Sequence, residues 1–162
     1  MDPTHRGPVE VRAAVITVSS TRTEATDTSG QLIRDRFGAA GHPVVYSAIV
    51  PDTVPAIRAA VARALECANC IVLSGGTGLT HDDCTIEAVV SFYDRTIDGF
   101  GELFRARSLL EIGTAAMLSR ASAGLVGRSV IFCIPGSTGA ARLALEDLIL
   151  PEIGHILTPV GR

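Results

Sequence analysis

Residues 70–85 have the sequence CIVLSGGTGLTHDDCT. A short apolar run, Ile71 to Leu73, stops at a glycine-rich segment, two carboxylates follow at Asp82 and Asp83, and residues 84–93 are predicted to form a helix. A buried strand, a glycine-rich turn and a helix start are the usual layout of a phosphate site in an α/β protein, because the N–H groups of such a turn form a nest for an anion. The stretch predicts either a phosphate site with Mg²⁺ between phosphate and acids, or a tight strand-to-helix connection with solvated acids.

The rest of the chain alternates between predicted strands and predicted helices. β-Branched or apolar runs predict strands at 11–18, 42–49, 70–73 and 129–134. Apolar residues at helical spacing predict helices at 28–37, 54–65, 84–93, 103–110, 111–118 and 140–150, with Pro151 interrupting the last of them. Residues 119–126 carry no clear pattern. The alternation of strands and helices predicts an α/β fold with a mainly parallel central sheet.

Right-handed crossovers place the loops that follow parallel strands at one edge of a sheet, which is where ligands bind. Four segments are therefore expected to converge, at 19–29, 50–52, 74–83 and 135–138. Thr28 and Gln31 have the spacing of a capping box, and Ser137 or Thr138 is expected to cap the helix that follows. Asp52 stands at an N-cap position, and an acid that faces a ligand from the helix start is the alternative interpretation.

The composition bounds the class of protein. The 162 residues suit one domain, expected at 11–162 after a mobile tail at 1–10. The net charge of −3 provides no basic field for nucleic acid, and no apolar run approaches the length of a membrane span, so a cytoplasmic protein is expected. All 14 basic residues are arginine, which excludes a Walker lysine and a Schiff-base lysine.

The cysteine and histidine residues give weaker evidence for a functional site than the glycine-rich stretch does. Cys67 and Cys70 form a lone C-x₂-C without further zinc ligands nearby, so the four cysteines are expected to be reduced thiols, with a redox pair as the alternative. His81 is expected either to contact phosphate or to be a solvated loop residue. The glycine turn is neither a Walker A motif nor G-x-G-x-x-G, and no G-x-S-x-G elbow is present.

An ordered set of short motifs resembles the MoaB/MogA family of molybdenum cofactor biosynthesis, and its MoaB branch in particular. The resemblance runs from about residue 11 to 157. Its motifs are TVSS (17–20), DTSG (27–30), SGGTG (74–78), DCTIEA (83–88), GFGE (99–102), LSRA (118–121) and PGS (135–137). Each motif alone is weak, whereas the ordered set is specific.

The resemblance implies a three-layer α/β/α sandwich of the molybdopterin-binding fold. It also implies a molybdopterin adenylyltransferase, which joins AMP from Mg·ATP to the terminal phosphate of molybdopterin and releases pyrophosphate. The implied cofactors and substrates are Mg²⁺, ATP and molybdopterin, and the implied partner is a molybdate-inserting protein of the MoeA type. Family members assemble as homotrimers or as hexamers of two trimers.

Site residues follow from the resemblance motif by motif. The phosphate-binding turn corresponds to Ser74, Gly75, Gly76, Thr77 and Gly78. The functional acids, for Mg²⁺ and nucleotide, correspond to Asp52 and Asp83. The pterin-site segments correspond to Ser119, Arg120, Pro135, Gly136 and Ser137, and further contacts are expected from Ser19, Asp27, Ser29 and Gly30.

Three residues depart from the family pattern. Ser20 stands where many members have Asp, Asp82 stands where an Arg often precedes the functional acid, and Cys84 replaces a common Val. The first two remove an acid and a phosphate-binding cation. A non-catalytic molybdopterin-binding or scaffold protein is therefore the alternative function, and a hydrolase of nucleotide pyrophosphates on the same fold is a third.

Overall fold

The protein, described here from a computed structural model over residues 9–160, has one six-stranded sheet in the order β2-β1-β3-β6-β5-β4. Its strands are β1 (Ala13–Val18), β2 (Val44–Val50), β3 (Cys70–Ser74), β4 (Arg95–Thr96), β5 (Ser122–Val126) and β6 (Ser129–Ile134). Strands β2, β1, β3 and β6 pair in parallel, whereas β5 runs antiparallel to β6 and β4 antiparallel to β5. The predicted α/β fold with a mainly parallel sheet is confirmed.

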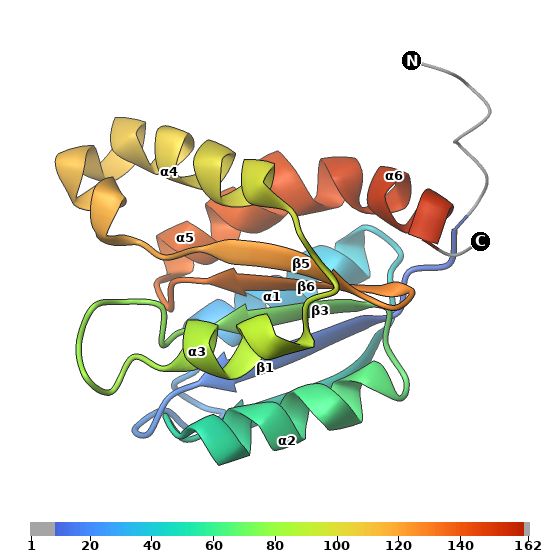
Figure 1. The fold of residues 1–162 in the computed structure, drawn as a ribbon, viewed down its shortest axis with the longest axis horizontal. Coiled ribbons are helices and arrows are strands. Elements are labelled where there is room, and N and C mark those ends of the chain that lie inside the picture. The colour runs from blue at the N-terminus through green and yellow to red at the C-terminus, as the bar shows by residue number, and fades with distance from the viewer. Residues whose placement is uncertain (1–8, 161–162) are drawn as a thin grey trace.

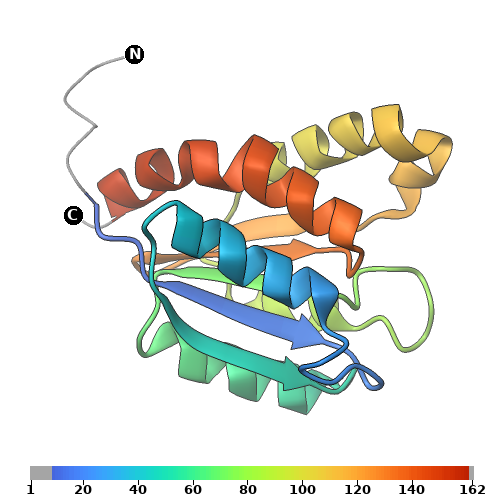
Figure 2. The ribbon, with the colours of Figure 1, turned by 180° about the vertical axis from the view of Figure 1, so that it is seen from behind.

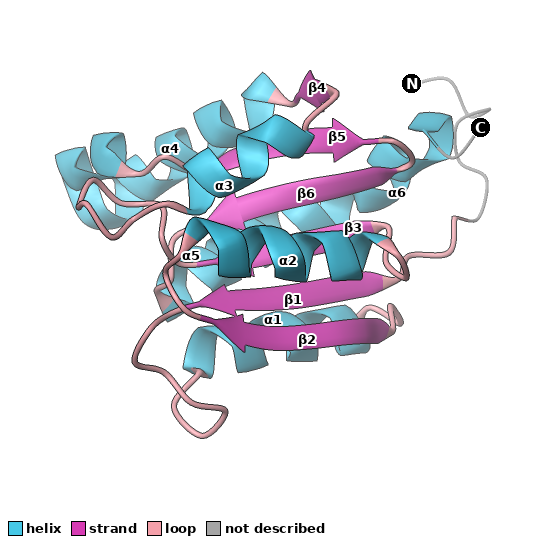
Figure 3. Cartoon of the chain, turned by 60° about the horizontal axis from the view of Figure 1, so that its bottom comes forward, coloured by secondary structure: helices cyan, strands magenta, loops and turns pink. Residues whose placement is uncertain are grey.

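Helices cover both faces of the sheet and produce three layers (Figures 1 and 3). The helices α2 (Val54–Leu65) and α3 (Thr85–Val89), the latter followed by the 3-10 turn η2 (Val90–Phe92), lie on one face. On the other face lie α1 (Thr28–Ala39), α4 (Asp98–Ile112), α5 (Thr138–Leu143) and α6 (Leu150–Val160), of which α1 and α6 are in front in Figure 2. The 3-10 helix η3 (Gly113–Leu118) follows α4, and the π-helical segment η4 (Ala144–Ile149) joins α5 to α6.

The central strands are buried on both faces, as their continuous apolar runs predict. Successive side chains of a strand point to opposite faces, so each strand supplies two cores. Val15 and Val72 pack with α1, α4 and the C-terminal helices, whereas Ile16 and Leu73 pack with α2 and α3. The sheet is thus fixed from both sides, and its carboxyl edge is a rigid platform for the loops.

The antiparallel edge of the sheet was not predicted. Strand β5 lies in the segment without a clear pattern, because its small residues and Gly124 are poor strand formers. A Cβ atom at Gly124 would collide with the ring of Tyr93, whose hydroxyl lies 3.2 Å from Ser122 Oγ. The aromatic ring thus covers the glycine backbone and supplies the packing that the strand's own side chains lack.

The predicted interruption at Pro151 is wrong, because the chain stays helical from Thr138 to Val160. Proline removes an N–H donor and its ring clashes with the carbonyl four residues earlier in a regular α-helix. The segment just before Pro151 is π-helical, with wider turns, and this accommodates the ring without breaking the helix.

Of the predicted caps of α1 and α5, one is wrong and one is confirmed. The N-cap of α1 is Asp27 rather than Thr28, since the Asp27 Oδ1 atom accepts the Gly30 N–H at 3.0 Å, so the predicted capping box is not formed. Ser137 caps α5 as predicted, accepting the Ala140 N–H at 3.1 Å. The predicted mobile tail, 1–10, lies outside the described residues except for Val9 and Glu10.

Candidate functional site

The four loops expected to converge do lie together, beyond the carboxyl ends of β1, β2, β3 and β6 (Figure 3). The N–H of Ser19 donates to the carbonyl of Val50 at 2.9 Å, which ties the first loop to the second. The N–H of Gly75 donates to the carbonyl of Ile134 at 2.9 Å, which ties the third loop to the fourth.

The glycine turn after β3 is closely packed. Gly75 and Gly76 have φ values of +104° and +68°, and a Cβ atom at either position would collide, with the Val18 carbonyl and the Thr85 hydroxyl respectively. Thr85 fastens the turn, because its hydroxyl donates to the Gly75 carbonyl at 2.8 Å and its N–H donates to the Gly76 carbonyl at 3.0 Å. The turn is therefore a tight strand-to-helix connection with a fixed backbone, and such a backbone also suits a rigid anion nest.

Asp83 faces this turn. A Cβ atom at Gly78 would lie 2.7 Å from Asp83 Oδ2, so the glycine makes room for the carboxylate. The same oxygen accepts the Thr80 hydroxyl at 2.7 Å and the Thr80 N–H at 3.0 Å. The Thr80 hydroxyl is the main cause that lowers the pKa of Asp83 below its usual value, so the group is ionised at neutral pH. Asp82 and His81, by contrast, are exposed.

Arg120, predicted as a pterin ligand, holds the glycine turn in place. Its Nε donates to the Gly78 carbonyl at 3.0 Å, one Nη donates to the Asp83 carbonyl at 3.0 Å, and the other forms an ion pair with Glu87. Its own N–H donates to the Thr77 carbonyl at 3.3 Å. These bonds join the segment Ser119–Arg120 to both ends of the loop, while pterin binding by these residues stays a prediction.

Asp52 is not the N-cap of α2, because that position belongs to Thr53. Instead, Asp52 Oδ2 accepts both the N–H of Ser20, at 2.9 Å, and the Ser20 hydroxyl, at 2.8 Å. The Asp52 N–H donates back to Ser20 Oγ at 3.1 Å. The alternative interpretation of Asp52, as an acid in the ligand-facing loops, therefore agrees better with its position.

The charges of Asp52 and Asp83 both act on the thiol of Cys84. The pKa of Cys84 is raised, first by burial and then by the negative charges of nearby acids, which include both Asp52 and Asp83. Within residues 9–160, no three side chains of the His, Cys, Asp or Glu type are grouped closely enough to hold a metal ion by themselves. Two carboxylates without a full protein cage fit Mg²⁺, which is commonly held by one or two carboxylates together with substrate phosphates.

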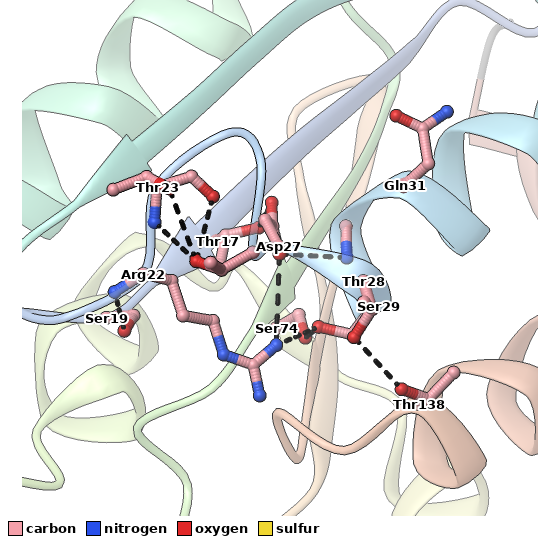
Figure 4. A network of polar contacts seen from close by, with 12 residues as sticks. Thr17, Ser19, Arg22, Thr23, Asp27, Thr28, Ser29, Gln31, Ser74 and Thr138 are labelled. Atoms are coloured by element: carbon pink, nitrogen blue, oxygen red, sulfur yellow. Dashed lines mark hydrogen bonds and ion pairs between the residues drawn. The ribbon is translucent and has the colours of Figure 1, made fainter.

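A buried polar network lies beside the glycine turn (Figure 4). Asp27 is only 1% exposed, and its Oδ2 accepts the Thr17 hydroxyl at 2.7 Å. Ser29 and Ser74 are also buried, with their hydroxyl oxygens 3.5 Å apart. A Cβ atom at Gly30 would collide with Asp27. The predicted contacts Asp27, Ser29 and Gly30 thus adjoin Ser74, the first residue of the predicted phosphate turn.

Arg22 belongs to this network and was missed from the sequence. Its Nη1 donates to Ser29 Oγ at 3.0 Å and lies 4.0 Å from Asp27 Oδ1. It lies in no motif, and the only hint in the sequence is that it is the one basic residue between 19 and 29.

The remaining predicted segment, Pro135 to Ser137, lies against the glycine turn. A Cβ atom at Gly136 would be 3.3 Å from the Cα atom of Gly75, so the two glycine backbones pass close to each other. A hollow of about 380 Å³ lies beside the turn, and a second of about 430 Å³ lies beside the start of α1. Residues that line the first include Asp83, Glu87 and Arg120, and residues that line the second include Asp27 and Thr138.

The cysteines form no second site in the described structure. All four are free thiols, and Cys70 and Cys133 are fully buried in the sheet. Burial raises the pKa of both, that of Cys133 to about 12, so neither is a thiolate at neutral pH. Among the described residues, no helix is both long and apolar enough to cross a membrane.

Comparison with known proteins agrees with the fold and the motifs. Residues 14–155 match the family described as "Probable molybdopterin binding domain". The Molybdenum cofactor biosynthesis protein B of Bacillus cereus is 51% identical over 160 residues, which is 97% of this chain and 95% of that protein. The protein of the same name from Escherichia coli K12 is 45% identical over 147 residues, or 90% of this chain and 86% of that protein.

A solved structure agrees as well. The tungsten cofactor synthesizing protein MoaB from Pyrococcus furiosus superimposes with a TM-score of 0.88 at 36% identity, over 96% of this chain and all of that one.

Proposed function

The chain belongs to the family of molybdopterin-binding domains that contains the Molybdenum cofactor biosynthesis protein B relatives, and from this premise we propose that it is a molybdopterin adenylyltransferase. In this reaction an oxygen of the terminal phosphate of molybdopterin attacks the α-phosphorus of ATP. A new P–O bond forms, the bond between the α-phosphorus and the bridging oxygen breaks, and pyrophosphate leaves with that electron pair. The product is the adenylylated pterin, ready for molybdate insertion.

The observation that carries this proposal is that two acids from different loops lie at the same edge of the sheet, and one of them, Asp83, faces the rigid glycine turn. Asp52 comes from the loop after β2 and Asp83 from the loop after β3, and the charges of both act on the thiol of Cys84. Transfer of a phosphoryl or nucleotidyl group depends mainly on positioning and charge neutralisation, so it needs no dedicated nucleophile from the protein. A pair of carboxylates beside an anion nest supplies this combination.

In the proposed site, Asp52 and Asp83 would hold Mg²⁺, and the ion would neutralise charge on the ATP phosphates. The Gly75 N–H is bonded to the Ile134 carbonyl, so the N–H groups of Gly76 and Thr77 would cradle the phosphates, and Thr85 keeps that backbone in place. Ser119, Arg120 and the segment Pro135–Ser137 contact the pterin, with Arg120 acting at the same time on the loop that carries Asp83.

A second candidate function is that of a non-catalytic molybdopterin-binding or scaffold protein. The observation in its favour is that Ser20, in place of a common Asp, binds Asp52 Oδ2 and thereby occupies one oxygen of a predicted metal ligand. The exposed Asp82 adds a negative charge where a cation is common. The charge of Asp82 weakens phosphate binding unless Mg²⁺ or another arginine offsets it.

We also propose that the chain forms a homo-oligomer, a trimer or a hexamer, and delivers its product to a molybdate-inserting protein of the MoeA type. An exposed apolar surface supports the first part. Large apolar side chains that are at least half exposed gather on α4 and η3, here called the α4–η3 surface: Leu103, Leu109, Leu110, Ile112, Met117 and Leu118. Exposed apolar groups of this size often mark protein interfaces.

The test of the enzyme proposal is release of pyrophosphate from molybdopterin and Mg·ATP. Appearance of the adenylylated pterin, in an amount equal to the pyrophosphate, is the expected result. If the pterin-loaded protein releases no pyrophosphate, the transferase proposal is wrong. The non-catalytic function then stands if molybdopterin still binds.

A further inference from the structure

The loop from Ser19 to Asp27 is built so that Arg22 points into the site. The Arg22 N–H donates to Ser19 Oγ at 3.0 Å, and the Thr23 N–H donates to Thr26 Oγ1 at 2.9 Å. These local bonds fix the backbone on both sides of Arg22. Its guanidinium therefore lies in Figure 4 beside Ser29 and Ser74.

The charge of Arg22 is not required to neutralise Asp27. That buried carboxylate is already bonded by the Thr17 hydroxyl and the Gly30 N–H. A second arginine, Arg34, has its Nη1 at 3.9 Å from Asp27, while that of Arg22 lies at 4.0 Å. One carboxylate faces two guanidinium groups, so Asp27, Arg22 and Arg34 together carry a net charge of +1.

Two hydrogen-bond donor atoms of Arg22 have no partner among the described residues. Arg34 donates to Ser47 and Gln31, Arg120 is engaged by the glycine loop and Glu87, and Arg58 donates to Ala88 and Ser91. Arg22 uses only Nη1 on side-chain partners, and within residues 9–160 its Nε and Nη2 have none. The Arg22 side chain is 34% exposed, so it is partly accessible to solvent.

We propose that Arg22 binds a phosphate group of the substrates and offsets the acids at this edge of the sheet. The Nε and Nη2 atoms of an arginine form a planar fork that matches two phosphate oxygens. The Nη1 atom of the same guanidinium contacts Ser29, whose hydroxyl lies 3.5 Å from that of Ser74, the residue before Gly75, so the fork is held on a loop that borders the glycine turn. With no lysine in the chain, an arginine is the only side chain with a permanent positive charge available for this task.

The inference rests on the proposed function for the identity of the ligand, which is a phosphate ester or anhydride. Two groups have this chemistry, the terminal phosphate of molybdopterin and the triphosphate of ATP. The first measurement therefore uses inorganic pyrophosphate as a probe, titrated into the full-length protein by calorimetry. Arg22→Gln is expected to weaken pyrophosphate binding by about 10- to 100-fold, since bonds to charged groups are lost, and Arg22→Lys by less.

Arg34→Gln is the matched control. It removes the same charge at nearly the same distance from Asp27, but its donors are engaged by Ser47 and Gln31, so pyrophosphate affinity should stay within about twofold. Equal losses in the two Gln variants, or no binding of pyrophosphate by the native protein at millimolar concentration, would overturn the inference. Thermal melting of each variant shows whether it is folded, and Arg22→Lys carries the comparison if Arg22→Gln is not.

Kinetics then identify the source of the phosphate. A rise in KM for molybdopterin alone assigns the fork to the pterin phosphate, and a rise in KM for Mg·ATP alone assigns it to the nucleotide. Native protein that binds pyrophosphate through Arg22 but never releases it from ATP would contradict the transferase proposal and leave the inference intact. If Arg22→Gln turns over at the native rate with unchanged KM values, the transferase proposal stands and the inference about Arg22 is wrong.

Discussion

Ser20 and Asp52 hold each other across two loops by three hydrogen bonds, at 2.8, 2.9 and 3.1 Å. Only Oδ2 of the carboxylate is used, and within the described chain Oδ1 accepts no hydrogen bond. A serine in this place thus orients the acid without adding a second negative charge. The departure from the family pattern at Ser20 is accordingly consistent with an active site as well as with an inactive one.

We predict that Ser20→Ala lowers the rate of pyrophosphate release by about tenfold or more, because Asp52 loses a hydrogen bond to its charged form. The free energy of unfolding should change by less than about 1 kcal/mol, since Ser20 is exposed. Thr21→Ala is the control, as it removes a hydroxyl from the same loop without contact to Asp52. An unchanged rate in Ser20→Ala would show that the pair is only structural.

Asp83→Asn is expected to abolish turnover and to leave molybdopterin binding intact. The amide keeps the size of the side chain but cannot bind Mg²⁺ as a carboxylate does. The loss of turnover is measured by pyrophosphate release, and the retained binding is measured by the fluorescence of molybdopterin. Retained turnover would mean that Asp83 serves only to bind Thr80.

The same carboxylate predicts a pH dependence of stability. The pKa of Asp83 is lowered in the folded protein, chiefly by the Thr80 hydroxyl, so as pH falls the unfolded chain takes up this proton first. The stabilisation from Asp83 is therefore complete above the ordinary Asp pKa of about 4 and is lost as pH falls through the lowered value. Urea unfolding should show a constant difference between native protein and Asp83→Asn from pH 7 to 5. That difference should shrink below pH 4, and a difference that grows with acid would contradict this assignment.

Arg120→Gln should loosen the glycine loop. The variant loses bonds to the carbonyls of Gly78 and Asp83 as well as the pair with Glu87, and a cost of about 1–3 kcal/mol in unfolding free energy is expected. Amide hydrogen exchange between residues 78 and 87 should become faster. Glu87→Gln is the control, because it removes only the exposed ion pair and should cost less than about 1 kcal/mol. If both variants cost the same, the carbonyl bonds do not hold the loop.

The α4–η3 surface predicts self-association. Leu110 and Met117 are 84% and 77% exposed, so replacing each by Glu should leave the fold intact while it places charge in the expected interface. Sedimentation velocity should show a smaller species for Leu110→Glu and Met117→Glu than for the native protein. Val45→Glu, on the opposite edge strand β2, is the control. A native protein that sediments as a monomer would contradict the oligomer proposal.

Much of the fold was predictable because its main elements carry strong local patterns. The strands β1, β3 and β6 are continuous apolar runs, and α2 has one apolar face, so their positions differ from prediction by two residues at most. Strand β5 was not predictable in this way, because Gly124 is stabilised by Tyr93, a residue from a different segment. Local propensity contains no information about such a contact.

Some residues of the candidate site could likewise be identified from the sequence, and others could not. Glycines 75, 76 and 78 could be recognised, since a backbone with positive φ or a crowded Cβ position demands glycine whatever the ligand. The partner of Asp52 and the position of Arg22 depend on how two irregular loops meet, and no periodicity describes them. The absence of lysine leaves arginine, backbone N–H groups or a metal to meet a phosphate, and it does not indicate which arginine would do so.

The π-helical turn before Pro151 has a consequence for the phase of the last helix. Buried residues recur here at every fourth position: Ala141, Leu145, Ile149, Ile153 and Leu157. In a straight α-helix each step of four residues overshoots a full turn by about 40°, so the last of these would drift by about 160° away from the first. The wider turn at Ala144–Ile149 takes up part of this rotation. Residues on both sides of it can therefore face the same sheet, although their spacing does not suit a regular helix.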